Sequence, residues 1–125
     1  MRLLLDTHVV LWELAEGPTV GTAATASIAD AEELRVSVVS FVEIGIKVGV
    51  GKLRVPDRLP ELIREAGAEL LALAPEHGLG IAELPLHHRD PFDRLLISQA
   101  RFEGLTILTA DRRFAAYHVP VLDAS

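Results

Sequence analysis

The sequence has 125 residues, of which 50% are hydrophobic, carries a formal net charge of −6 and contains no cysteine. The lack of cysteine excludes disulfides, thiolate metal sites and cysteine nucleophiles, so a metal site would have to use oxygen or imidazole ligands. The acidic balance argues at first against nucleic acid, because phosphate binding usually accompanies a basic excess, and the absence of a signal-peptide pattern or membrane-length apolar run predicts a cytoplasmic protein.

The length suits a single domain spanning residues 1–125, and its N-terminal part predicts one strand and two helices. Residues 2–5 form a short apolar run that is typical of a buried parallel strand. A helix is expected directly afterwards, over residues 7–16, and a second one over residues 19–31. Asp6 lies at the junction of strand and helix, where an aspartate is more often a helix cap than a metal ligand.

The next strand is expected over residues 34–39, again with a helix directly behind it. Ser40 and Glu43 fit the capping-box pattern, a hydroxyl at the N-cap and a glutamate three residues later, for a helix that reaches about Val48. Glu43 therefore has a structural explanation, which is the better one when this residue is taken alone.

The middle of the chain and its tail predict the remaining elements of a sheet. A helix is expected over residues 59–68 and a strand over residues 69–73, although the same run could extend the helix. Residues 75–83 predict a short helix. The apolar tail, residues 119–122, predicts a strand at an edge of the sheet.

Residues 87–117 contain two acidic turns on a single strand and helix unit. Asp90 is expected to cap a helix, Pro91 suits its first position, and Asp93 falls at the third, where a carboxylate is favoured by the helix dipole. Gly104 should end this helix. The capping explanation therefore accounts for either aspartate when it is considered alone.

A strand over residues 105–108 should follow, and then the turn Thr109-Ala110-Asp111. Asp111 is explained equally well as the start of a helix over residues 112–117. A functional role for any of these acidic residues must therefore come from their combination.

Strands that alternate with helices predict an α/β fold with a parallel sheet and right-handed crossovers. In such a sheet every strand-to-helix junction lies at the carboxyl edge, where open α/β proteins bind their ligands. Four acidic residues lie at or within one helical turn of such a junction: Asp6, Glu43, Asp93 and Asp111. Caps can equally be Ser, Thr, Asn or Gly, so acidic residues at four junctions exceed what capping requires.

Converging carboxylates repel one another and resist full ionisation unless a cation joins them. Oxygen-rich sites of this kind suit Mg²⁺ or Mn²⁺, and two such ions roughly 3.5–4 Å apart can activate water and stabilise the leaving oxygen of a phosphodiester. Five of the ten arginines lie in residues 87–117, so a basic rim on an acidic protein is compatible with phosphate binding. Arg94 and Arg112 are the candidates for contacting phosphate. An equal alternative is that both are simply exposed residues of their helices.

Three stretches resemble PIN-domain ribonucleases that act as VapC toxins of type II toxin–antitoxin pairs: LLLDTHVVLW, SFVEIGIKVGVGKL, and HRDPFDRLL followed by TAD. The resemblance runs in order over nearly the whole chain, and HRDPFDRLL with TAD is its most specific part. It departs from the usual pattern at Val42, where many relatives have tryptophan, which affects packing near Glu43 and no ligand. The resemblance implies a PIN-domain-like three-layer sandwich, with a central, mostly parallel sheet flanked by helices.

By position, Asp6, Glu43, Asp93 and Asp111 match the acidic metal-binding residues of that family, and Thr109 matches its accompanying hydroxyl. The resemblance implies endonucleolytic cleavage of RNA that depends on Mg²⁺ or Mn²⁺. It also implies a homodimer that is inhibited by a VapB-type antitoxin and forms a larger complex with it.

Two other functions compete with this interpretation. A catalytically silent binding module with the same fold would act through an RNA or protein partner, although the retention of all four acidic residues argues against it. A phospho-accepting domain would use Asp6 as its nucleophile, but such folds need a second aspartate close by and a lysine on a later strand end. His88 is expected to be a hydrogen-bonded structural residue rather than a base.

Overall fold

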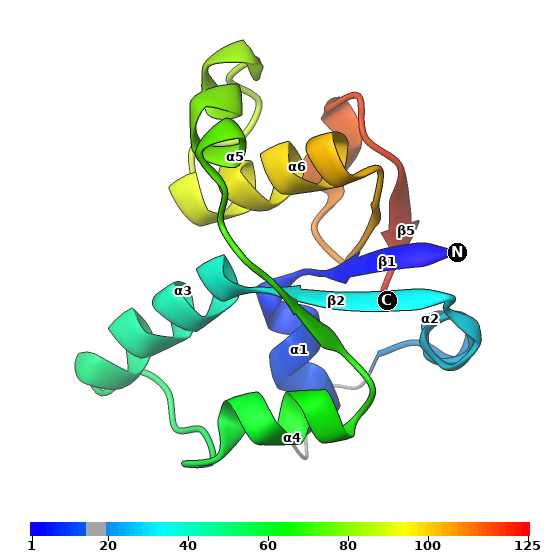
Figure 1. Ribbon diagram of the computed structural model, residues 1–125, viewed down its shortest axis with the longest axis vertical. Coiled ribbons are helices and arrows are strands. Elements are labelled where there is room, and N and C mark those ends of the chain that lie inside the picture. Colours follow the sequence, from blue (N-terminus) through cyan, green and yellow to red (C-terminus); the bar gives the residue numbers. More distant parts are fainter. Residues whose placement is uncertain (15–19) are drawn as a thin grey trace.

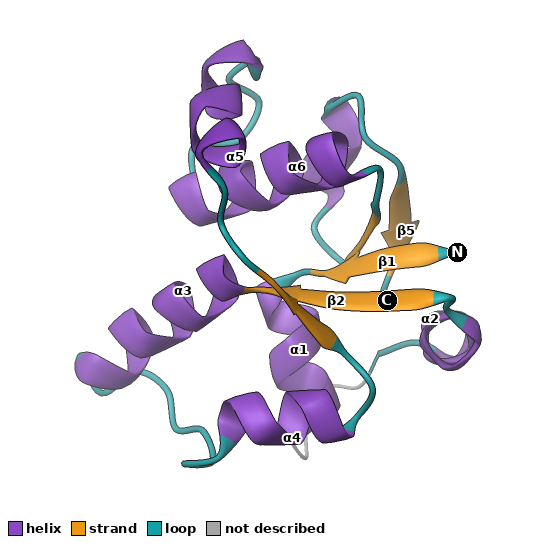
Figure 2. Cartoon of the chain, viewed as in Figure 1, coloured by secondary structure: helices purple, strands orange, loops and turns teal. Residues whose placement is uncertain are grey.

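Five parallel strands form the centre of the molecule and helices cover both faces, as the computed structural model shows for residues 1–14 and 20–125 (Figures 1 and 2). The strands are β1 (Arg2–Leu5), β2 (Glu33–Ser37), β3 (Glu69–Leu71), β4 (Thr106–Thr109) and β5 (Val121–Asp123). The helices are α1 (Thr7–Leu14), α2 (Thr22–Asp30), α3 (Val38–Gly49), α4 (Leu59–Glu65), α5 (Pro75–Leu79) and α6 (Pro91–Glu103), with short 3₁₀ helices η1 (Gly80–Glu83) and η2 (Arg112–Ala116). The predicted three-layer α/β fold is confirmed.

The strand order is β3-β2-β1-β4-β5, and every neighbouring pair is parallel. β1 therefore lies in the middle of the sheet, with β2 on one side and β4 on the other. The register pairs Leu4 with Ile107 and Leu5 with Leu108, so β1 and β4 end side by side. The residues that follow these two strands consequently meet at the same edge.

Alternate residues of the strands enter two separate hydrophobic clusters, one on each face. Leu5 and Leu108 pack in the cluster that includes α1, α2 and α4, whereas Leu4 and Ile107 pack with α6 and η2. Fully burying such an aliphatic side chain contributes about 1.5–3 kcal/mol. The two clusters together hold the carboxyl edge of the sheet in place.

Helix α6 forms as its ends predict. The Asp90 side chain accepts hydrogen bonds from the backbone N–H groups of Phe92 and Asp93, and Pro91 occupies the first helical position. Gly104 ends the helix in the left-handed conformation with φ of 67°, where a side chain would be strained. The helix thus begins at the acidic turn, with Asp93 in its first turn.

The predicted start of α3 was wrong by three residues. The pairing of β2 with β3 ends at Ser37, and the Ser37 side chain, rather than that of Ser40, accepts from a backbone N–H at the helix start. Ser40 instead lies inside the helix, with its hydroxyl 2.8 Å from the Thr7 hydroxyl. Glu43 is therefore well inside α3 and has no capping role, so the structural explanation for its charge does not hold.

Other boundaries differ by a few residues. The third strand ends at Leu71, the segment 75–83 divides into α5 and η1, and β5 covers Val121–Asp123 at the edge of the sheet. The predicted end of the first helix at residue 16 and the start of the second at residue 19 lie outside the described residues. Within the described ranges, no helix has the length and apolar character needed to cross a membrane.

Candidate metal centre

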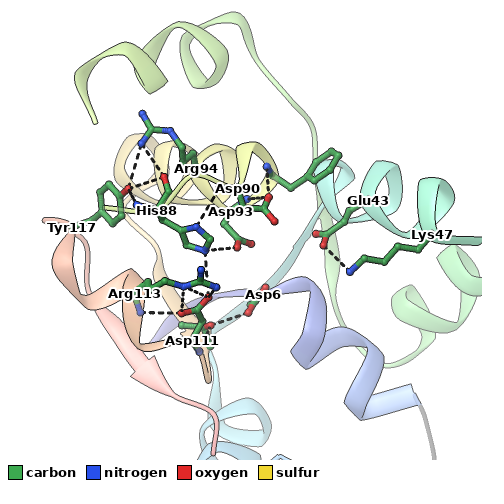
Figure 3. Close-up of polar contacts among 12 residues, drawn as sticks. Asp6, Glu43, Lys47, His88, Asp90, Asp93, Arg94, Asp111, Arg113 and Tyr117 are labelled. Carbon is green, nitrogen blue, oxygen red and sulfur yellow. Dashed lines mark hydrogen bonds and ion pairs between the residues drawn. The ribbon is translucent and has the colours of Figure 1, made fainter. Parts of the chain in front are cut away.

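Four acidic side chains from separate parts of the chain surround one region at the carboxyl edge of the sheet (Figure 3). Asp6 directly follows β1, and Asp111 lies just beyond β4 and caps η2. Glu43 comes from α3, and Asp93 from the first turn of α6. The chain therefore brings all four predicted acidic residues to the same edge, although they are far apart in the sequence.

Asp6 and Glu43 have the same arrangement: one oxygen is held by a side-chain donor and the other has no partner. Asp6 Oδ2 accepts from Thr109 Oγ1 at 2.8 Å, and Glu43 Oε2 lies 3.1 Å from Lys47 Nζ. Asp6 Oδ1 and Glu43 Oε1 are buried without a hydrogen-bond partner among the described residues. The two residues are only 3% and 5% exposed, so these oxygens are also shielded from water.

Burial without a partner costs free energy, because a desolvated polar atom has lost its bonds to water. A cation bound by these oxygens would remove that cost. Burial is also the main cause that raises the pKa of Asp6 above its usual range, and the charge of Glu43 adds to it. The residues present therefore fit a divalent cation held by oxygen ligands.

The pKa of Asp93 shows the effect of crowded negative charge most clearly. Burial, and after it the charges of Asp6, Asp90, Glu43 and Asp111 in that order, together raise this pKa to about 8. Full ionisation of this carboxyl at neutral pH thus calls for an added positive charge. A bound cation would supply that charge.

Asp111 is in the opposite electrostatic situation. The Arg113 guanidinium contacts both of its oxygens, with Nε 3.0 Å from Oδ1 and Nη2 2.8 Å from Oδ2, and the Arg113 backbone N–H also donates to Oδ1. These contacts lower the pKa of Asp111 to about 2. Sequence analysis missed this role of Arg113, for which an arginine two residues after a predicted cap was the available signal.

His88 is a member of the centre that sequence analysis left without a role in it. Its Nε2 lies 2.7 Å from Asp93 Oδ2 and 3.3 Å from Asp111 Oδ2 (Figure 3). Neither oxygen meets the geometry of a straight hydrogen bond from the ring N–H. The ligand atoms of His88, Asp93 and Asp111 all lie within 4.8 Å of one another, and Asp6 and Glu43 are not part of this tight group.

A model of the PIN domain matches residues 3–119 of the sequence. The chain belongs to the PIN-domain family. The protein Ribonuclease VapC22 of Mycobacterium tuberculosis is 30% identical over 126 residues, which cover 94% of this chain and 93% of that protein. This similarity places the present PIN domain with the VapC-type members of the family.

Solved structures share the fold at lower sequence identity. VapBC2 from Rickettsia felis, bound to a DNA fragment from its promoter, is 16% identical with a TM-score of 0.73 and full coverage of both chains. DNA-bound VapBC from Salmonella typhimurium has the same identity and TM-score, with 100% of this chain and 99% of that chain covered. FitAcB from Neisseria gonorrhoeae is 20% identical with a TM-score of 0.64, and the match covers 97% of this chain and 96% of that chain.

The two arginines predicted to contact phosphate lie in different surroundings in this PIN domain. The Arg94 guanidinium donates to the Tyr117 hydroxyl and to backbone carbonyls of η1 and of the loop before α6: Ile81, Leu84, Pro85 and His88. Arg94 is thus engaged inside the protein, and we leave it out of the proposed phosphate contacts. Arg112 is exposed and, with Thr109 and Asp111, lines a hollow of about 410 Å³ beside the centre.

Proposed function

We propose that this PIN domain is the toxin of a type II toxin–antitoxin system and cleaves RNA internally in a reaction that depends on Mg²⁺, with Mn²⁺ as a substitute. The observation that carries the proposal is the pair of buried, unpartnered oxygens of Asp6 and Glu43 beside the crowded carboxyl of Asp93. The similarity to a protein named as a ribonuclease supports it.

Asp6, Glu43, Asp93 and Asp111 would hold the metal. When bound, a divalent cation supplies positive charge that polarises a phosphodiester and lowers the pKa of water. Carboxylates are suitable ligands for Mg²⁺ and Mn²⁺, and the absence of cysteine in the chain agrees with a hard cation. The expected product carries a 5′-phosphate.

The chain's own residues prepare this reaction by fixing the ligands and binding the RNA backbone. The Thr109 hydroxyl donates to Asp6 Oδ2 and accepts from the Asp111 backbone N–H at 3.0 Å, so it positions two ligands at once. Arg112 is exposed at the rim beside Asp111, where its guanidinium can bind a phosphate with two hydrogen bonds. Local positive charge at this rim offsets the acidic balance of the whole protein.

The proposed partners are a VapB-type antitoxin and a second copy of the chain, assembled into a larger complex. The structural neighbours VapBC2 and VapBC are complexes named for a VapB and a VapC component, and both are bound to DNA. Helix α3 and its C-cap residue expose an apolar stripe at helical spacing, formed by Val42, Ile46 and the cap Val50, which are 55%, 53% and 63% exposed. Such a stripe suits burial against another protein surface.

The test is cleavage of a mixed cellular RNA pool by purified protein that is free of antitoxin, with Mg²⁺ or Mn²⁺ and with EDTA as the control. Asp93→Asn removes one ligand charge, and Asp57→Asn makes the same change in an exposed turn. We expect discrete cuts that need metal, persist in Asp57→Asn and are lost in Asp93→Asn. Sequencing of the new ends then identifies the target.

Two results would contradict the proposal. Equal cutting by wild type and Asp93→Asn would exclude the four-carboxylate mechanism. Inert wild-type protein that binds RNA with the same affinity in EDTA and in Mn²⁺ would identify a catalytically silent binding module instead.

A further inference from the structure

We propose that His88 is a positioning residue of the metal centre: its Nε2 carries the ring hydrogen, lies against both Asp93 and Asp111 and keeps these two ligands together by electrostatic attraction, while the ring itself stays off the metal. The proposal rests on the function proposed above. The three side chains are grouped closely enough to form a metal site by themselves, so whether His88 is a ligand or a donor decides how the centre is built.

The hydrogen bonds of the ring decide between these roles. His88 Nδ1 lies 3.2 Å from the backbone nitrogen of Asp90, which can only donate, so Nδ1 must be the accepting nitrogen. The neutral imidazole then carries its hydrogen on Nε2, the atom that lies between the two carboxylates. A metal ligand would need a free lone pair on Nε2, and the hydrogen would then have to move to Nδ1 and face the Asp90 N–H.

The surroundings of His88 leave the ring little freedom to turn into a different position. The residue is 4% exposed, and its backbone N–H donates to the Tyr117 hydroxyl at 2.9 Å. The same hydroxyl accepts from Arg94 Nη1 at 3.3 Å, and Arg94 also donates to the His88 carbonyl. The ring lies edge-on to Phe114, with centroids 5.9 Å apart.

Arg94, Tyr117 and the Asp90 backbone therefore hold His88, and His88 in turn lies against two ligands. Residues that contact metal ligands in this way orient those ligands. Loss of such a residue typically lowers metal affinity about 10–100-fold. A donor between Asp93 and Asp111 offsets the repulsion of two carboxylates that share one face of the centre. Asp90 thus contributes twice, with its side chain as the helix cap and with its N–H as the group that selects the tautomer.

The first test compares two amides at this position. The side-chain amide of His88→Gln can place an N–H donor near the position of Nε2, whereas that of His88→Asn reaches only as far as Nδ1. We expect Mn²⁺ affinity, measured by calorimetry, to fall at least about 10-fold in His88→Asn and by less than about 3-fold in His88→Gln. His118→Asn, at an exposed position, is the matched control and should bind as the wild type does.

Equal losses in the two His88 variants would overturn the proposal, provided that thermal melting shows both are folded. Pulsed electron paramagnetic resonance of wild-type protein with Mn²⁺ gives an independent decision. We expect no coupling from a directly coordinated imidazole nitrogen, and such a coupling would identify His88 as a ligand and overturn the proposal.

A third measurement keeps the inference testable even if the proposed function fails. Nitrogen-15 NMR of the wild-type ring, recorded in EDTA, should show the neutral form with hydrogen on Nε2. Hydrogen on Nδ1 would overturn the proposal whether or not the protein binds a metal. Wild-type protein that binds no Mn²⁺ would instead contradict the proposed function, and the tautomer would still report on the geometry around His88.

Discussion

The two pairs of carboxylates in the centre are prepared for a cation in different ways. Asp6 and Glu43 each have one oxygen held by a side chain and one buried oxygen without a partner. Asp93 and Asp111 lie against donors that also contact the oxygens a metal would need, namely His88 and Arg113. The first pair is thus preorganised, whereas the second must exchange or share its present contacts.

This difference predicts that Asp6→Asn has the largest effect on metal binding. The substitution keeps an oxygen that can accept from the Thr109 hydroxyl, but it replaces the unpartnered carboxylate oxygen Oδ1 with an uncharged amide group. We expect Mn²⁺ affinity to fall by more than about 100-fold. That exceeds the typical loss when a residue that only supports a ligand is removed. Calorimetry checks the affinity, and a thermal melt in EDTA checks the fold; unchanged binding would show that the first pair does not hold the cation.

Asp93→Asn should reveal the strain that the second pair carries without metal. Because the folded-state pKa of about 8 exceeds the unfolded value, the carboxyl destabilises the fold increasingly as pH rises from about 4 towards 8, and the effect levels off above that. The variant removes this ionisation. We expect its melting temperature in EDTA to exceed that of the wild type by more at pH 8 than at pH 5.

Addition of saturating Mn²⁺ at pH 8 should reverse this order. Binding to the folded state at 100 times Kd stabilises a protein by about 2.7 kcal/mol, and the variant should gain much less. A difference in melting temperature that does not change between pH 5 and pH 8 would contradict the charge crowding around Asp93.

Arg113→Gln should strengthen metal binding. The guanidinium occupies both Asp111 oxygens, and its side chain is 62% exposed, so it competes with a cation without being locked in place. Exposed pairs of this kind are weak, so we expect Mn²⁺ to bind only about 1.4-fold to 5-fold more tightly. Arg64→Gln removes the same charge from exposed α4 and should have no effect; weaker binding by the Arg113 variant would show that this residue supports the site.

Lys47→Met should have the smallest effect and sharpens the comparison. It removes one positive charge, as Arg113→Gln does, but Lys47 contacts only Glu43 Oε2 and leaves Oε1 free. Pairs four residues apart on a helix contribute about 0.3–0.5 kcal/mol. We expect the Mn²⁺ affinity to change less than in Arg113→Gln, and a larger change would mean that both oxygens of Glu43 are needed.

The edge on which the four carboxylates meet could be predicted because it follows from topology. Parallel strands bring every strand-to-helix junction together, so Asp6 and Asp111 had to be near each other once β1 and β4 were neighbours. The environment of Glu43 could not be predicted, since Ser37 and Ser40 are both plausible caps. Only the last pair of the β2–β3 ladder, at Ser37, determines which one begins the helix.

The roles of His88 and Arg94 could not be predicted for a different reason. Both depend on the segment of η1 and the following loop, whose path follows no periodicity, and Arg94 meets its carbonyl partners only after that segment has folded against α6. An arginine on a helix beside an acidic turn can contact a phosphate, or it can donate hydrogen bonds to the backbone carbonyls of a neighbouring segment. The choice rests on tertiary contacts that have no local pattern.

The position of Asp6 at the end of the central strand also affects how the protein can be controlled. Its backbone N–H donates to the Leu108 carbonyl at 3.0 Å, within the pair of strands buried between both hydrophobic clusters. Such amides open only when the whole domain unfolds, so Asp6 should be among the slowest to exchange hydrogen with solvent. Local opening elsewhere in the domain should therefore leave Asp6 in place, and the antitoxin proposed above would meet this ligand in its folded position.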